Sequence, residues 1–220
     1  MPWLKFGINT ILPSVIYQPR PPIPETLKGL RDDSVVLDVG AGGRIIRKGI
    51  INIDLIPFEN TDLVTDIHKM AVKDESVDCI FCTGVFEHIA CPEKALEEFS
   101  RILKPGGIVH LEVPFMQPFH ADPVDYYRWT LDGFKLFCSR QGFEELVSGS
   151  HLGPASAMNA IIIAFWQSWF TNRYLRKGVD VILSFLLFPF KYLDIFLCGR
   201  DHNLSSAVFF VGRKQSASLE

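Results

Sequence analysis

Short apolar runs, bounded by glycine, proline and acidic residues, dominate the first half of the chain. Continuous runs of this kind are typical of strands that are buried on both faces of a parallel sheet. Between two of them, apolar residues at helical spacing predict a helix over 92–103 that packs against the sheet. The runs predict strands over Ser34–Val39, Ile50–Asp54, Asp62–Thr65, Val77–Phe81 and Ile108–Val113.

The second half of the chain is more apolar. A helix is predicted near Leu131–Ser139, a sixth strand near 142–147 and a last strand over Ser206–Gly212. Between the last two strands lies an insertion, about 152–204, whose apolar runs predict helices. Because charged and polar residues interrupt both runs, a helix that spans a membrane is not expected.

The insertion leaves three interpretations open. The simpler two are a helical lid over the sheet and a surface that pairs two copies in a homodimer. The third is a pair of helices, within 155–197, that docks on a membrane surface. In that arrangement aromatic and basic side chains would lie at the level of the lipid headgroups. These side chains are Trp166, Trp169, Arg173, Tyr174, Arg176 and Lys177.

The start of the chain differs from the rest. Residues 1–24 are rich in proline, which disfavours regular helix. We therefore predict an irregular N-terminal segment over 1–30, followed by a single domain over 31–220 that contains the insertion. The apolar residues of the segment indicate that it covers the domain or a membrane surface. Residues 1–16 lack the regions of a signal peptide.

Composition and charge limit which binding partners and which cellular compartment are expected. The 220 residues suit one domain with a substantial core. A formal net charge of −3 and a pI near 6.1 give no basic field, so nucleic acid is not expected as a partner. Scattered cysteines indicate a reducing, cytoplasmic location, peripheral to the inner face of the membrane if the insertion docks there. Cys79 and Cys82 have zinc-like spacing but no second pair, so buried thiols on a strand are expected.

The most informative stretch follows the first predicted strand. The strand reaches Asp38, and Gly40 and Gly42 come directly after it. In open α/β sheets ligands bind at this carboxyl edge, and glycines let the backbone approach them closely. A dinucleotide site would need a third glycine, where this chain has Ile45, and a longer crossover helix. Because Asp38 would also repel a pyrophosphate, the positively charged S-adenosylmethionine fits the loop better than NAD(P).

The motifs occur in an order that resembles class I S-adenosylmethionine-dependent methyltransferases. The resemblance covers 35–113 closely. It implies an α/β fold with a seven-stranded, mostly parallel Rossmann-like sheet, an antiparallel last strand and helices on both faces. The short crossover after the first strand departs from the family pattern and predicts a stunted or absent helix there. The motifs are Leu37–Gly42, Asp54, Asp66, Phe86–His88 and Leu103–Gly107.

The resemblance also implies where the methyl donor binds. Asp38, with the backbone at Gly40 and Gly42, would hold its methionine end. Asp54, which ends the second strand, would accept hydrogen bonds from the ribose hydroxyls. S-adenosylmethionine is therefore the expected cofactor, and no resident metal is expected.

Two further pairs of positions complete the expected donor site. Asp66 and the backbone of Ile67 would contact the adenine. Thr83 and Gly84, at the end of the fourth strand, would lie beside the methionine moiety.

A second informative stretch, 113–130, leaves the fifth strand at the same edge. Methyl transfer to a hydroxyl needs a group that accepts the hydroxyl proton, and a histidine suits that task. His120 is the first candidate, oriented by Asp122 or Asp125, and His88 is the rival. Arg128 could bind an anionic group of the acceptor.

Structural roles for the same stretch stay open. Asp125, Arg128 and Thr130 could pair with one another and cap the following helix. His120, Asp122 and Asp125 could also supply mixed nitrogen and oxygen ligands to a metal, although their spacing is loose.

The expected function is transfer of a methyl group to an oxygen, less favourably a nitrogen, of a small-molecule, glycan or lipid-linked acceptor. The glycan alternative rests on a likeness of this loop to methyltransferase-like proteins of polysaccharide assembly. An S-adenosylmethionine-binding scaffold without methyl transfer is the alternative. A reductase that uses a nucleotide cofactor is disfavoured by Asp38 and the missing third glycine.

Overall fold

The computed structural model describes residues 14, 16, 23–121, 123–197 and 203–215. The fold divides into two compact units. The first, here called the sheet unit, comprises the described residues of 20–115, 120–149 and 208–220. The second, here called the hairpin unit, comprises those of 1–19, 116–119 and 150–207. The N-terminal segment predicted over 1–30 lies mostly outside the described residues, and the domain boundaries stay a prediction.

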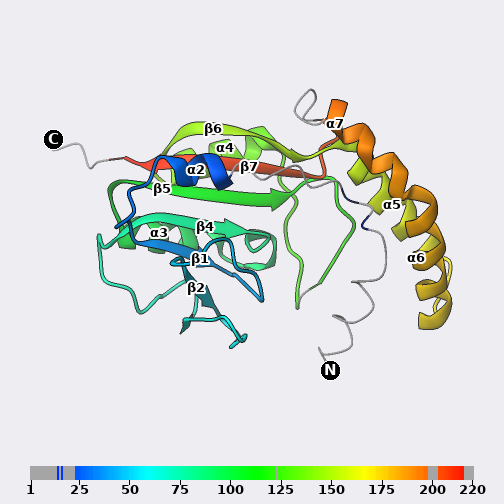
Figure 1. The fold of residues 1–220 in the computed structure, drawn as a ribbon, viewed down its shortest axis with the longest axis horizontal. Helices are drawn as coiled ribbons and strands as arrows, with labels where there is room; N and C mark the ends of the chain where they lie inside the picture. The colour runs from blue at the N-terminus through cyan, green and yellow to red at the C-terminus, as the bar shows by residue number, and fades with distance from the viewer. Residues whose placement is uncertain (1–13, 15, 17–22, 122, 198–202, 216–220) are drawn as a thin grey trace. The chain divides into compact units, whose positions relative to one another are not determined.

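A seven-stranded sheet forms the centre of the fold, with the order β3-β2-β1-β4-β5-β7-β6 (Figure 1). The first five strands pair in parallel, whereas β7 runs in the opposite direction, as Figure 1 shows. This confirms the predicted fold class. The strands are β1 (Val36–Val39), β2 (Ile51–Asp54), β3 (Leu63–Val64), β4 (Val77–Thr83), β5 (Leu103–Pro114), β6 (Phe143–Leu152) and β7 (Ala207–Lys214).

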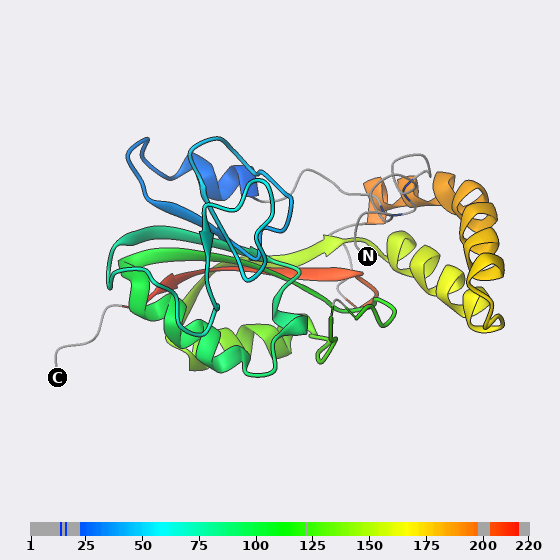
Figure 2. The ribbon, with the colours of Figure 1, turned by 90° about the horizontal axis from the view of Figure 1, so that it is seen from below.

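Helices cover both faces of the sheet. Figure 2 shows α2 (Ile23–Lys28) on one face, and α3 (Pro92–Ile102) and α4 (Leu131–Arg140) on the other. The two faces follow from alternation along the strands, since Val36 packs with α2 and the neighbouring Leu37 belongs to the cluster that contains α3. The larger core therefore lies between the sheet and α3.

Two details differ from the sequence expectation. The helix predicted to Leu103 ends at Ile102, and β5 begins at Leu103 instead of Ile108. Val77 pairs with Leu103 but Cys79 pairs with Ile108, so the register shifts here and β5 accommodates extra residues opposite β4. The predicted absence of a helix after β1 is confirmed, because residues 40–50 form turns.

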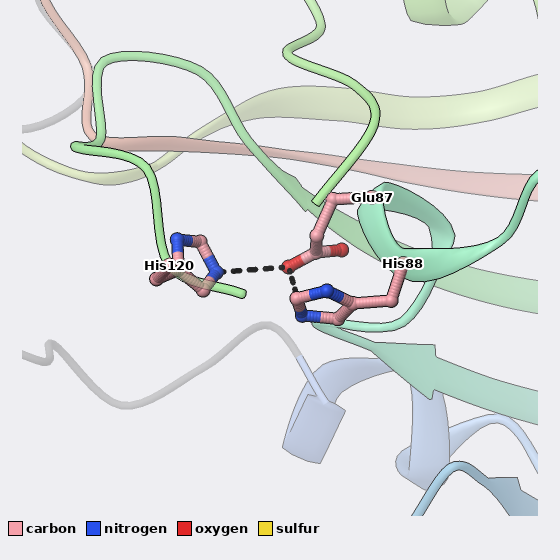
Figure 3. A group of neighbouring side chains, drawn as sticks. All are labelled: Glu87, His88 and His120. Atoms are coloured by element: carbon pink, nitrogen blue, oxygen red, sulfur yellow. Dashed lines mark ion pairs between the residues drawn. The ribbon is translucent and has the colours of Figure 1, made fainter. Parts of the chain in front are cut away.

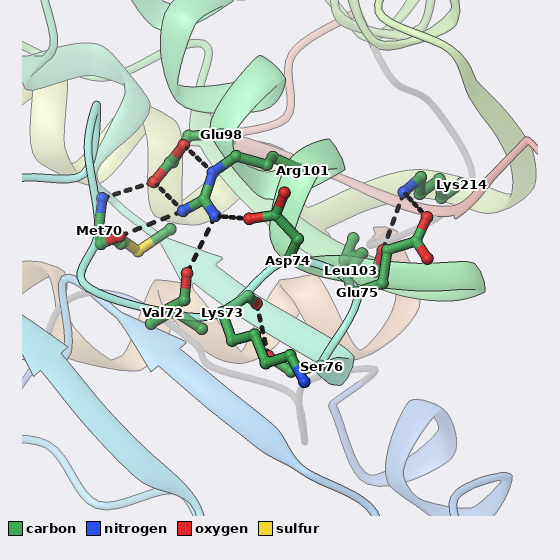
Figure 4. Close-up of polar contacts among 10 residues, drawn as sticks. All are labelled: Met70, Val72, Lys73, Asp74, Glu75, Ser76, Glu98, Arg101, Leu103 and Lys214. Atoms are coloured by element: carbon green, nitrogen blue, oxygen red, sulfur yellow. Dashed lines mark hydrogen bonds and ion pairs between the residues drawn. The ribbon is translucent and has the colours of Figure 1, made fainter.

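A charged network ties α3 to the loop before β4 (Figure 4). The Arg101 guanidinium donates to both Glu98 oxygens, at 2.8 and 2.6 Å, and to the carbonyls of Met70 and Val72. Glu98, which is buried, also accepts from the Met70 N–H. The hydrogen bonds from Arg101 lower the pKa of Glu98 below its ordinary value of 4.5, although burial opposes them. The ionised carboxylate therefore stabilises the fold.

We expect Glu98→Gln to lower the free energy of unfolding by about 2 kcal/mol at neutral pH, because the Arg101 cation loses its buried charged partner and keeps only the exposed Asp74. The stabilisation is complete above pH 4.5 and is lost as pH falls through the lower pKa of the folded state. Urea unfolding of both proteins at several pH values measures the difference. The exposed neighbour Glu97, changed to Gln, is the matched control. A pH-independent difference would contradict the assignment.

The hairpin unit contains the helices of the insertion, which were predicted. They are α5 (Pro154–Ser168), α6 (Arg173–Leu187), the 3-10 helix η2 (Phe188–Leu193) and α7 (Asp194–Leu197). The buried Asp194 carboxylate caps α5 by accepting from the N–H groups of Ala155 and Ser156, at 2.8 and 2.9 Å. Asn172 caps α6 by accepting from the Tyr174 N–H. Among the described residues, no helix has the length and apolar character needed to cross a membrane.

Candidate active site

The glycine loop after β1 lies tightly against its neighbours. Gly40 has φ +72°, and a Cβ there would lie 2.2 Å from a methyl carbon of Val85. Its N–H donates to the Ile53 carbonyl at 2.8 Å, which holds the loop against the end of β2. Gly42 has φ +57°, with open space where a Cβ would be. Both positions therefore favour glycine, one for space and both for conformation.

Asp38 is fully buried at the end of β1 and forms a bidentate ion pair with Arg44 of the loop. The guanidinium donates from Nη2 to Oδ1 at 2.6 Å and from Nε to Oδ2 at 3.2 Å, and also donates to the Thr83 hydroxyl. Burial raises the pKa of Asp38, and the Arg44 contact opposes that rise. The site thus presents a carboxylate and a guanidinium side by side. Arg44 was not predicted as a site residue, although the sequence places this cation two residues after Gly42.

The other predicted donor residues lie along the same edge. The Asp54 carboxylate accepts from the N–H groups of Gly42 and Ile56 at 2.8 and 3.0 Å, which leaves further lone pairs for ribose hydroxyls. Gly84 has φ +68°. Asp66 accepts from the His68 N–H and ring, and these contacts lower its pKa. The neighbouring Ile67 packs on the core, so its backbone position is fixed.

A buried histidine links α2 to the edge, and sequence reasoning missed it as well. His110 of β5 contacts the Thr26 hydroxyl through Nδ1 at 3.1 Å and Glu112 through Nε2 at 3.0 Å. The alternation of polar and apolar residues in β5 is the sequence feature that could have indicated this histidine. Glu112 pairs in register with Thr83, so this row of polar groups lies next to the donor loop.

Two histidines converge on a buried carboxylate directly after β4 (Figure 3). Glu87 and His88 belong to the 3-10 helix η1 (Phe86–His88), and His120 belongs to the loop after β5. Nε2 of His88 and of His120 lie 3.8 and 3.7 Å from Oε1 of Glu87, too far for direct hydrogen bonds. Oε2 of Glu87 is buried without a hydrogen-bond partner. The three side chains therefore bring polar atoms close together without bonding directly to one another.

The neighbours of the two rings favour opposite tautomers. Nδ1 of His88 contacts the carbonyl of Val124, which only accepts, so His88 carries its proton there and its Nε2 has a lone pair. Nδ1 of His120 lies 3.2 Å from a guanidinium nitrogen of Arg128, which only donates, so the neutral His120 carries its proton on Nε2. One ring therefore presents an acceptor, and the other a donor, toward Glu87.

The predicted orienting role of Asp125 needs correction. Asp125 accepts from the backbone N–H of His120 at 2.8 Å, but its carboxylate is 3.7 Å from the ring nitrogen. Arg128 holds both its oxygens and keeps the pKa of Asp125 well below its usual range. Asp125 therefore fixes the loop rather than the ring. Thr130 caps α4 by accepting from Gly133, which confirms the structural interpretation of these residues, and Asp122 lies outside the described residues.

A metal ion has a different candidate donor set from the one considered in the sequence. In the described chain, Glu87, His88 and His120 bring ligand atoms within 4.8 Å of one another. The hydrogen on Nε2 of His120, favoured by Arg128, opposes metal binding there, so we propose no ion. Cys79 and Cys82 are buried on β4, and burial raises the pKa of Cys79 to about 12, so the expectation of buried thiols is confirmed.

Comparison with known proteins supports the same family. A family model described as a methyltransferase domain matches residues 52–111, from β2 to β5. The fold matches a chain from the complex between the Haloferax volcanii Trm112 methyltransferase activator and a methyltransferase, at 17% identity and TM-score 0.54, over 88% of this chain and 89% of that one. The family match and the fold support a class I S-adenosylmethionine-dependent methyltransferase domain. They also support S-adenosylmethionine as the cofactor.

A second solved structure has a similar fold. Phosphoethanolamine N-methyltransferase 2 of Haemonchus contortus, solved with S-adenosylhomocysteine, matches at 15% identity and TM-score 0.57, over 88% of this chain and 52% of that chain. At this identity the likeness concerns the fold alone.

Curated relatives of this chain are similar to it over short stretches. A mouse tRNA (carboxymethyluridine(34)-5-O)-methyltransferase is 30% identical over 52% of this chain and 20% of its own length. A Campylobacter curvus tRNA U34 carboxymethyltransferase is 27% identical over 36% of this chain and 30% of its own. The chain thus spans less than a third of the length of these relatives. Their names conflict with the expectation that nucleic acid is excluded as an acceptor.

Proposed function

We propose that this chain transfers the methyl group of S-adenosylmethionine to an oxygen atom of its acceptor. The observation that carries the proposal is the pair of rings beside Glu87. His88 offers a lone pair that can take the proton of a hydroxyl, and His120 offers an N–H that can hold the oxygen. A nitrogen acceptor that is already a free amine would need no such proton acceptor.

The carboxyl edge fits the methyl donor. The paired Asp38 and Arg44 offer a carboxylate to the ammonium and a guanidinium to the carboxylate of its amino-acid end. Asp54 would hold the ribose hydroxyls, and Asp66 with the backbone of Ile67 the adenine. Thr83 and Gly84 would line the methionine moiety. S-adenosylmethionine supplies an electrophilic methyl group on its sulfonium when it is bound.

Within this scheme His88 replaces His120 as the proposed proton acceptor. The carboxylate of Glu87, 3.8 Å from Nε2 of His88, would stabilise the imidazolium that forms when the hydroxyl proton is taken. His120 positions the acceptor oxygen. Arg128 fixes the His120 tautomer instead of binding the acceptor directly.

The acceptor class is proposed as a small-molecule, glycan or lipid-linked hydroxyl compound. We no longer exclude RNA, because two relatives are named as tRNA-modifying enzymes. The name of the mouse relative also specifies an oxygen acceptor, which supports oxygen over nitrogen. A cytoplasmic location stays part of the proposal.

Labelled S-adenosylmethionine tests the function directly. The purified chain is incubated with cell extract, which is then separated into lipid, glycan, small-molecule and RNA fractions for mass spectrometry. We expect an O-linked labelled methyl group in one of the first three fractions. Label in RNA alone would overturn the proposed acceptor class, and label on nitrogen would overturn the oxygen assignment. Bound donor without any transfer would favour a scaffold that only binds S-adenosylmethionine.

A further inference from the structure

The helices of the hairpin unit bury small and polar side chains and expose large apolar ones. The side chains buried in α5 and α6 are Ala155, Ser156, Ala157, Asn159, Ile163 and Ser184. More than half of the exposed large hydrophobic side chains in the described part of the chain lie in this unit. On α5, on α6 and directly after α5 they are Met158, Ile161, Phe165, Trp166, Trp169, Tyr174, Leu175, Ile182, Phe185 and Leu186. This distribution is the reverse of that of a helix in water.

Among the described residues of the unit, buried polar contacts join the helices. Asn159 of α5 donates from its amide to the carbonyl of Leu187, at the end of α6, at 3.2 Å. The Ser156 hydroxyl donates to the buried Asp194 at 2.6 Å. Small residues and hydrogen bonds at the interface, with large apolar residues outside, are typical of helices that pack in lipid.

The types of side chain exposed on the helices of the hairpin unit change along α5 and α6. Near the turn between α5 and α6 the unit carries Trp169, Tyr174 and Arg173, whose guanidinium lies 4.8 Å from the Tyr174 ring centroid. Along the middle of α6 it carries Ile182 and Phe185. Tryptophan, tyrosine and arginine next to apolar side chains match the boundary between headgroups and acyl chains.

Charges on the unit complement an anionic surface. The helices between Pro154 and Leu197 contain two acidic residues, Asp180 and Asp194. Asp194 is buried in the α5 cap, and Asp180 pairs with Lys177 at 2.7 Å. Arg173 and Arg176 are exposed, whereas neither of the two acidic residues of these helices is exposed.

We infer that the exposed face of α5 and α6 docks on the surface of an anionic lipid bilayer. Aromatic and apolar side chains enter the boundary of the acyl chains, while Arg173 and Arg176 contact lipid phosphates. A second copy of the chain would meet the same cations and be repelled, whereas an anionic bilayer attracts them. Figure 1 shows α5 and α6 side by side, so both helices can contribute to one surface.

Vesicle flotation with the full chain tests the inference. The vesicles contain phosphatidylcholine alone or with phosphatidylglycerol. We expect the chain to float with the anionic vesicles, and less so at high salt because the attraction is screened. The triple variant Ile182→Glu, Phe185→Glu, Leu186→Glu is expected to lower the partition coefficient at least tenfold. Leu136→Glu with Val147→Glu, exposed apolar positions of the sheet unit, is the matched control and should float like the wild type.

Charge reversal provides a second variant whose surface positions do not affect packing. Arg173→Glu with Arg176→Glu is expected to abolish the preference for anionic vesicles, and circular dichroism checks that both variants keep their helices. Failure of the wild type to float, or equal flotation of the triple variant, would overturn the inference. So would a wild-type dimer in sedimentation velocity that the triple variant dissolves, without vesicle binding. None of these measurements depends on methyl transfer.

Discussion

Asp38→Asn is expected to weaken the binding of S-adenosylmethionine at least a hundredfold. The substitution keeps the size of the side chain but removes the buried charge that would pair with the donor ammonium, and it leaves Arg44 without its bidentate partner. Calorimetric titration of the variant with S-adenosylmethionine measures the effect. Wild-type affinity should also fall in acid, because burial raises the pKa of Asp38 and protonation then begins at milder acidity.

The matched control for Asp38 is Asp33→Asn. Asp33 also pairs with an arginine, Arg31 at 2.8 Å, but both side chains are exposed and far from the donor loop along the strand. We expect its affinity for S-adenosylmethionine to stay within twofold of the wild type. Equal affinities of the two variants would show that Asp38 does not hold the donor.

His88→Ala is expected to lower kcat about a thousandfold while the affinity for S-adenosylmethionine stays within twofold. The reason is that Nε2 of His88 presents the free lone pair of the cluster, whereas Arg128 contacts Nδ1 of His120 and leaves the proton of that ring on Nε2. Single-turnover transfer from labelled donor, with the acceptor found by mass spectrometry, measures the rate. His120→Ala should cost less, about tenfold to a hundredfold, because it loses a positioning hydrogen bond.

The ranking of the two histidine variants is the informative result. If His120→Ala abolished transfer and His88→Ala retained most of it, the proton acceptor would be His120, and the tautomers inferred from Val124 and Arg128 would be wrong. A loss of donor affinity in either variant would indicate that the cluster belongs to the donor site.

Much of the sheet could be predicted because its strands are short, apolar and separated by strong turn signals. The order of Asp38, Asp54, Asp66 and Phe86–His88 along the chain was enough to place the carboxyl edge. The strand pairing at Leu103 and the register shift after it could not be predicted, since a proline and two glycines ordinarily mark a turn. The pairing of β5 with β4 outweighs the local preference of these residues for a turn.

The site was harder to predict than the fold, because its contacts join residues that are distant in sequence. Arg44 meets Asp38 only after the loop closes on β2, and Glu87 meets His120 only after the loop behind β5 folds back. The tautomers of His88 and His120 depend on Val124 and Arg128, which no sequence spacing reveals. The apolar insertion was recognised, but its reversed burial pattern required the structure.

Isothermal titration of the full chain with S-adenosylmethionine and with S-adenosylhomocysteine tests most directly whether the carboxyl edge of the sheet is a methyl-donor site. We expect both to bind at one site per chain, and NAD(P) to give no heat. If folded protein bound neither the donor nor its demethylated product, Asp38, Arg44 and Asp54 would have been assigned to the wrong ligand, and the proposed methyl transfer would be contradicted.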